Sequence, residues 1–159
     1  MVRAMRTANW SATRITLLVV VVLGLAIDAY VHFDLAGAFK NNKTSTLSEA
    51  DLFRAESIGA IVAAVALLVR PRRWTAGLAF VVAAGGTAAV VVYRYVNVGK
   101  FGPIPNMYDP YWAPFEKNLS VIGEVLAMLA ALALFVMFQR DAEGAPATRE
   151  RTSAAARTA

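Results

Sequence analysis

Five ionisable residues lie inside long apolar stretches of this chain, where charged side chains are uncommon and tend to be functional. Three of them are carboxylates and one is the chain's single histidine, four positions after the first carboxylate. One histidine with two or three carboxylates is a donor set for Zn²⁺, Mn²⁺ or Fe²⁺. The candidate polar site consists of Asp28, His32, Glu56, Arg94 and Glu124, and all of these except Arg94 are candidate metal ligands.

Four apolar runs carry these residues. Each approaches or exceeds the roughly 20 residues that a helix needs to cross the hydrocarbon core of a bilayer. The chain is 58% hydrophobic, and a soluble domain of that composition would expose large apolar patches. The sequence therefore predicts an all-α fold, an integral membrane four-helix bundle with helices at about 15–35, 50–69, 74–98 and 115–138.

The basic residues indicate the orientation. Ten of the 16 lysines and arginines lie at the two termini or between the second and third runs. The positive-inside rule then places both termini in the cytoplasm and the connections 36–51 and 99–117 outside. Because the charge lies in short segments between spans, we expect a lipid bilayer as partner and no nucleic acid. The predicted parts are a basic cytoplasmic N-terminus (1–14), a transmembrane domain (15–140) and a disordered cytoplasmic tail (141–159).

The N-terminus also has features of a signal peptide. Basic residues precede the first apolar run, and Ala36-Gly37-Ala38 resembles a cleavage site. The segment before that site is long for a signal peptide, however, and it carries the charged or polar residues Asp28, His32 and Asp34. We therefore keep the first run as a membrane span.

Local signals predict helix ends and packing faces. Ser48 followed by Asp51 is typical of a capping box, and Arg70-Pro71 ends the second run. Small residues at helical spacing allow close helix packing in lipid. These rows are Gly59, Ala63 and Ala66; Gly85 and Ala89; and Gly123, Ala127 and Ala131.

The three intramembrane carboxylates lie at a similar depth. Each is about 20 Å from the cytoplasmic end of its run at 1.5 Å per residue, within the outer half of the membrane. Buried charges of this kind should face the bundle interior and pair, and His32 and Arg94 are the expected compensating groups. A structural network of ion pairs is the leading interpretation. A metal site, a proton or ion path, and a lipid or quinone pocket are the alternatives.

The connection between the third and fourth runs is rich in proline and aromatic residues. Prolines restrict its conformations, and aromatics suit a membrane interface. We expect it to form a cap over the polar layer, with a docking surface as the alternative. Its candidate functional residues are Tyr108, Asp109 and Trp112.

Several segments resemble those of small four-span membrane proteins of actinobacteria. The resemblance covers residues 15–138 and excludes the tail. It implies the four-span architecture and an actinobacterial source, and it implies no activity. The segments are VHFDL (31–35), LSEADLFRAE (47–56), GPIPNMYDPYW (102–112) and EKNLS (116–120).

The sequence argues against catalysis. The chain has no cysteine, which excludes disulfides, iron–sulfur clusters and thiol chemistry. No nucleophile with a matching base and no phosphate-binding glycine loop is present. We expect a non-enzymatic, multi-pass protein of a bacterial plasma membrane. We expect it to have no cofactor and a structural polar layer. Its expected role is that of an accessory protein, with a membrane-protein partner or a second copy of itself as the binding partner. The alternative is a metal- or ion-binding protein using the cluster of Asp28, His32, Glu56 and Glu124.

Overall fold

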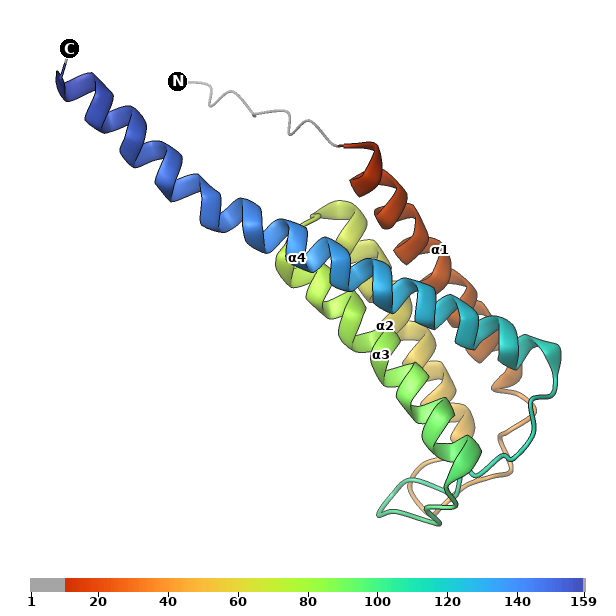
Figure 1. The fold of residues 1–159 in the computed structure, drawn as a ribbon. Helices are drawn as coiled ribbons and strands as arrows, with labels where there is room; N and C mark the ends of the chain where they lie inside the picture. Colours follow the sequence, from red (N-terminus) through yellow and green to blue (C-terminus); the bar gives the residue numbers. More distant parts are fainter. Residues whose placement is uncertain (1–10, 159) are drawn as a thin grey trace.

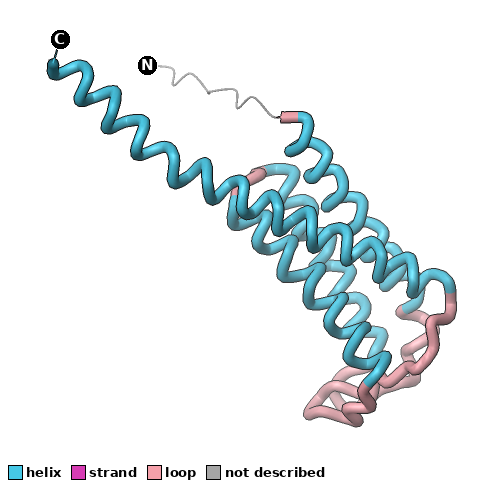
Figure 2. Tube along the Cα trace, in the orientation of Figure 1, coloured by secondary structure: helices cyan, strands magenta, loops and turns pink. Residues whose placement is uncertain are grey.

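The computed structural model describes the backbone of residues 11–158 and the side chains of residues 11–143. Four helices make up this part of the chain, and no strand occurs in it, which confirms the predicted all-α class (Figure 1). Consecutive helices pack against one another, and the fourth closes the bundle by packing against the first (Figure 2). The helices are α1 (Ala12–Leu35), α2 (Glu49–Val69), α3 (Arg73–Tyr95) and α4 (Phe115–Thr158).

The helix ends follow from local capping. At the start of α1 the Ser11 hydroxyl accepts a hydrogen bond from the backbone N–H of Arg14, so the helix begins three residues before the predicted position 15. The capping box predicted at Ser48 and Asp51 is present at the start of α2. Helix α3 ends at Tyr95 instead of position 98, and the backbone is extended at Val96.

The C-terminal segment differs from the prediction. In place of a disordered tail from position 141, α4 continues as a helix to Thr158. The segment is rich in alanine and arginine, which have high helix propensity, although it also contains Gly144 and Pro146. Because it continues an existing helix, it needs no new nucleus, which is the costly step in helix formation.

The contact between α1 and α4 is close because both helices have glycine there. A Cβ added to Gly24 would collide with the carbonyl oxygen of Gly123 and would lie 2.9 Å from the Cβ of Ala127. Ala127 and Ala131 are fully buried, as the row of small residues on α4 predicted. On α3, however, Gly86 faces the interior, and a Cβ on Gly85 would have nothing within 4 Å.

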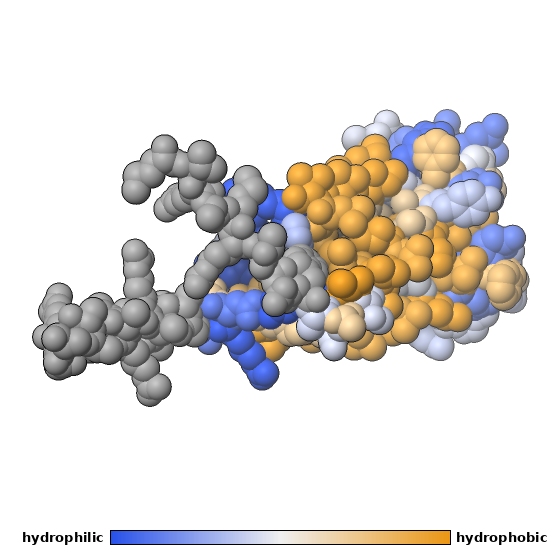
Figure 3. Space-filling model, turned by 90° about the horizontal axis from the view of Figure 1, so that it is seen from above, coloured by the Kyte–Doolittle hydropathy of each residue, from blue (hydrophilic) through white to orange (hydrophobic). Residues whose placement is uncertain are grey.

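All four helices are long and apolar enough to cross a membrane. Only 22% to 33% of each apolar window is buried inside the protein, so most of these side chains lie on the outside of the bundle. Figure 3 shows the resulting hydrophobic surface in the middle of the molecule, with hydrophilic residues on both sides of it. A surface of this kind is compatible with a multi-pass membrane protein.

The two longer connections, 36–48 and 96–114, lie together at one end of the bundle, and the short turn between α2 and α3 lies at the other (Figure 1). Side chains of the first connection bind the backbone of the second. Asn42 Nδ2 donates to the Asn106 carbonyl at 2.8 Å, and Thr44 Oγ1 donates to the Pro103 carbonyl at 2.8 Å. The end with the two long connections is called the loop end below.

Candidate functional site

Two ionisable residues of α1 form the first part of the site. Asp28 and His32 are four residues apart, so their side chains lie on the same face of the helix. The Nδ1 atom of His32 lies 2.7 Å from Asp28 Oδ1 and 3.1 Å from the Asp28 carbonyl oxygen. Asp28 therefore orients the imidazole ring through Nδ1.

Helix α4 supplies the second part. The hydroxyl of Ser120 lies 3.0 Å from Asp28 Oδ1 and 3.0 Å from Glu124 Oε1, so it bridges the carboxyl groups of two helices. A hydroxyl has one proton and can donate to only one of them. The other carboxyl group must then carry a proton of its own or face a cation.

Helix α3 leaves room for the carboxyl group of Glu124. A Cβ added to Gly86 would lie 3.0 to 3.2 Å from the carboxyl atoms of Glu124, so only glycine fits without displacing that group. The glycine contact between Gly24 and Gly123 brings α1 and α4 together about one helical turn from Asp28. The ligand atoms of Asp28, His32 and Glu124 consequently lie within 4.8 Å of one another.

The cluster is buried but incompletely bonded. Asp28 and Glu124 are both 0% exposed. Asp28 Oδ2 and Glu124 Oε2 have no hydrogen-bond partner among the described residues. A buried polar atom without a partner costs about 1–3 kcal/mol, and more when it is charged. The arrangement thus has two oxygen atoms available to a cation or a proton.

The other two residues of the predicted layer lie apart from this cluster. Glu56 on α2 lines the same cavity as His32 but does not belong to the group of three, and its Oε1 is buried without a partner. Arg94 does not compensate the carboxylates as predicted, since it forms no ion pair within the described residues. Its guanidinium lies over the rings of Tyr95 and Trp112, at 5.2 and 5.3 Å from the ring centroids.

The connection between α3 and α4 lies over the loop end of the bundle, as expected of a cap. Asp109 accepts a hydrogen bond from Lys117 Nζ at 2.7 Å, and its backbone N–H donates to the Tyr93 carbonyl at 3.1 Å. Trp112 packs its ring near the charges of Arg94 and Lys117, whereas Tyr108 is 38% exposed.

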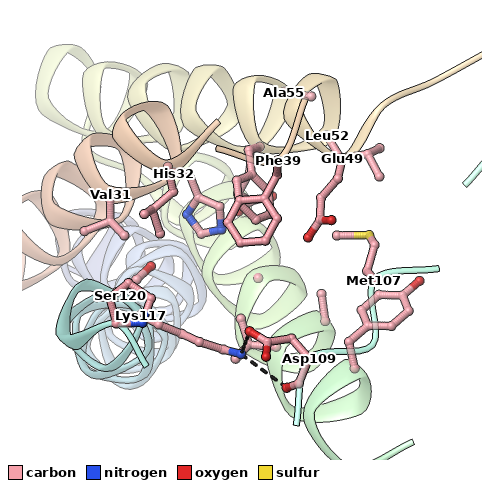
Figure 4. A pocket seen from close by; sticks show the side chains of 18 of the residues that line it. Val31, His32, Phe39, Glu49, Leu52, Ala55, Met107, Asp109, Lys117 and Ser120 are labelled. Atoms are coloured by element: carbon pink, nitrogen blue, oxygen red, sulfur yellow. Dashed lines mark hydrogen bonds and ion pairs between the residues drawn. The ribbon is translucent and has the colours of Figure 1, made fainter. Parts of the chain in front are cut away.

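A cavity of about 470 Å³ lies between the cap and the buried cluster. Figure 4 shows the side chains around it. The ion pair of Asp109 and Lys117 lines the cavity, and so do His32 and Ser120 of the buried cluster. Sequence reasoning missed Ser120 and Gly86, and it gave a pocket under the cap only as an alternative. Ser120 lies four residues before Glu124 on the same helix face, and that spacing was the available signal.

We compared the chain with models of protein families, with curated proteins and with solved structures, and nothing matches. The candidate function is therefore argued from the geometry of the site alone.

Proposed function

We propose that this chain is a multi-pass integral protein of a bacterial plasma membrane that binds one divalent metal ion through Asp28, His32 and Glu124. The observation that carries the proposal is the pair of fully buried carboxyl oxygens without a partner, Asp28 Oδ2 and Glu124 Oε2, beside an oriented imidazole. These are metal-ligand atom types, and they lie within 4.8 Å of one another.

A divalent ion fits the charge of the cluster when the imidazole is neutral. Two carboxylates carry two negative charges, and a neutral imidazole adds none, so a divalent cation makes the cluster neutral. Neutrality matters here because an uncompensated charge inside a membrane protein costs several kcal/mol. The imidazole nitrogen that faces the carboxyl groups is Nδ1, so the ion would bind there and would replace the hydrogen bond to Asp28.

The donor types indicate which ions fit. One nitrogen and two carboxylate groups suit Zn²⁺, Mn²⁺ or Fe²⁺. We propose no catalytic step, because the hydroxyl of Ser120 is bonded to both carboxyl groups and the residue is only 3% exposed, so it is held within the cluster. The ion would instead cross-link α1 and α4 at the loop end of the bundle.

A structural network is the second candidate, and the bridging position of Ser120 favours it. If one carboxyl group keeps a proton, it can donate to the hydroxyl, which then donates to the other carboxylate. Together with the pair of Asp28 and His32, this would hold the helices without a metal. We place it second because Asp28 Oδ2 and Glu124 Oε2 have no hydrogen-bond donor among the described residues, so a proton shared directly between the two carboxyl groups would be needed to satisfy them.

Zinc titration by calorimetry separates the two candidates. The full chain is purified in detergent without a polyhistidine tag and stripped with a chelator. We expect saturable binding that is lost in His32→Ala and weakens as the pH falls, since the ligands must be deprotonated. Asp34→Asn is the matched control, because Asp34 is an exposed carboxylate on the same helix. Titration with no saturable binding, or with the same affinity in His32→Ala, would leave the structural network as the role of the cluster.

A further inference from the structure

The cavity at the loop end is a second feature that the metal site does not explain. It has a volume of about 470 Å³, within the range of small-molecule sites in proteins. All four helices and the cap contribute to it, and most of its lining is apolar. The apolar lining includes Leu35, Leu52, Val90, Ile104 and Met107.

Two carboxylates on α2 give the cavity an excess of negative charge. Glu49 and Glu56 both line it, and neither forms an ion pair within the described residues. Glu49 is only 5% exposed and takes its one hydrogen bond from a neutral amide, Asn42 Nδ2, at 2.6 Å. The Oε1 atom of Glu56 is buried and has no hydrogen-bond partner in the part of the chain that the structure describes.

The remaining charged groups at the cavity already have partners. Asp109 and Lys117 form an ion pair at 2.7 Å, so they contribute little net charge. His32 is held by Asp28 at 2.7 Å. The two glutamates of α2 are therefore the groups that a positively charged ligand would neutralise.

Aromatic rings form part of the same wall. The ring centroids of Phe39 and Phe53 are 5.1 Å apart, and Phe53 contacts the ring of His32 at 5.1 Å in an edge arrangement. In Figure 4, the side chains of His32, Phe39 and Glu49 point into the cavity. Aromatic faces attract cations, most strongly where water is excluded.

We propose that this cavity binds a lipophilic organic monocation, such as an amphiphilic amine or a quaternary cation, with Glu56 as the main counter-charge. The apolar lining receives the body of the ligand, and the rings of Phe39 and Phe53 contact its charged part. An anion would be repelled by two unpaired carboxylates, and a neutral molecule would give them no counter-charge. The proposal does not depend on the metal, because Glu56 is not one of the three metal ligands.

The test uses two ions of the same size and shape and opposite charge. Tetraphenylphosphonium and tetraphenylborate are titrated separately into the full-length protein in a neutral detergent, each against an equal amount of empty micelles. We expect saturable binding of tetraphenylphosphonium, and no saturable binding of tetraphenylborate. We expect the Kd for tetraphenylphosphonium to rise about tenfold or more in Glu56→Gln, because a desolvated charge partner is lost. Asp34→Asn is the control and should bind as the wild type does.

Three outcomes would overturn the proposal. The first is no saturable binding of tetraphenylphosphonium by the wild type. The second is binding of both ions with similar affinity, which would indicate a site for apolar molecules in general. The third is a change of less than about tenfold in Glu56→Gln. If that variant does not fold, Glu49→Gln takes its place under the same criterion. Zinc titration of the same samples is an independent measurement, so the proposal of a metal site and the proposal of a cation site can each be refuted without the other.

Discussion

Gly24 of α1 lies against the backbone of Gly123 of α4, and neither residue has room for a side chain there. A Cβ on Gly24 would collide with the Gly123 carbonyl oxygen, and a Cβ on Gly123 would lie 3.1 Å from the Gly24 carbonyl oxygen. This contact sets the distance between the helices that carry Asp28 and Glu124. The buried cluster therefore depends on two residues that carry no chemistry of their own.

Replacing Gly24 with alanine tests this dependence. Because the obstructing atoms are backbone, the helices must separate, and we expect Gly24→Ala to lower the free energy of unfolding by about 3 kcal/mol. Thermal unfolding in detergent, followed by circular dichroism, measures the change. Gly85→Ala is the matched control, since a Cβ there meets nothing within 4 Å. Equal melting temperatures for the two variants would show that the contact between α1 and α4 is looser than described.

A second glycine acts on the site without holding the bundle together. A Cβ at Gly86 would lie 3.0 Å from the Glu124 carboxyl carbon, which belongs to a side chain that can rotate away. We expect Gly86→Ala to weaken zinc binding about tenfold, the low end of effects seen when groups around metal ligands are altered. We expect little change in its melting temperature. Zinc calorimetry on Gly86→Ala and Gly85→Ala, which are adjacent positions on α3, provides the comparison. Equal affinities would indicate that Glu124 does not bind the ion.

Part of this arrangement could be predicted from the sequence. The apolar runs give the four spans, and the similar depths of Asp28 and Glu124 predict that they lie in one layer. Which face of each helix points into the bundle was harder to predict. In an alanine-rich run such as Ala83–Ala89, small residues occur on every side, so the pattern cannot distinguish Gly85 from Gly86.

The position of Arg94 was not predictable for a different reason. It depends on where α3 ends and on a proline-rich connection that has no periodicity. The ring of Trp112, 18 positions later in that connection, receives the guanidinium instead of the carboxylates. The cavity likewise depends on how the two connections bind each other, as in the hydrogen bond from Asn42 to the Asn106 carbonyl. Contacts between irregular segments far apart in sequence leave no signal in a single sequence.

The lysine at the start of α4 should hold the cap in place. Lys117 Nζ donates to Asp109 Oδ2 at 2.7 Å and to the Tyr111 carbonyl at 3.0 Å, and its side chain is only 16% exposed. We expect Lys117→Met to destabilise the cap by about 1 kcal/mol. Hydrogen exchange measured by mass spectrometry should then be faster in residues 106–112, while the exchange of α1 is unchanged. Lys100→Met removes an exposed lysine from the same connection and should leave the exchange rates as they are in the wild type.

The absence of native cysteine makes the proposed orientation easy to test. Single cysteines are introduced as Ser45→Cys in the first connection and Ala142→Cys near the end of the apolar part of α4, both at exposed positions. The positive-inside rule predicts that a membrane-impermeant maleimide labels Ser45→Cys in intact cells and labels Ala142→Cys only after lysis. Labelling of Ala142→Cys in intact cells would indicate the opposite topology, with the C-terminal end of the bundle outside. It would also place the cluster in the cytoplasmic half of the membrane.

The central claim is that Asp28, His32 and Glu124 hold one divalent ion in the protein as cells make it. Metal content per chain, measured by mass spectrometry on protein purified from membranes without a polyhistidine tag, tests this most directly. The account predicts about one zinc, manganese or iron ion per chain in the wild type and in Asp34→Asn. It predicts almost none in Glu124→Gln, provided that this variant elutes as a folded species. Metal-free protein in all three samples, or the same metal content in Glu124→Gln as in the wild type, would contradict it.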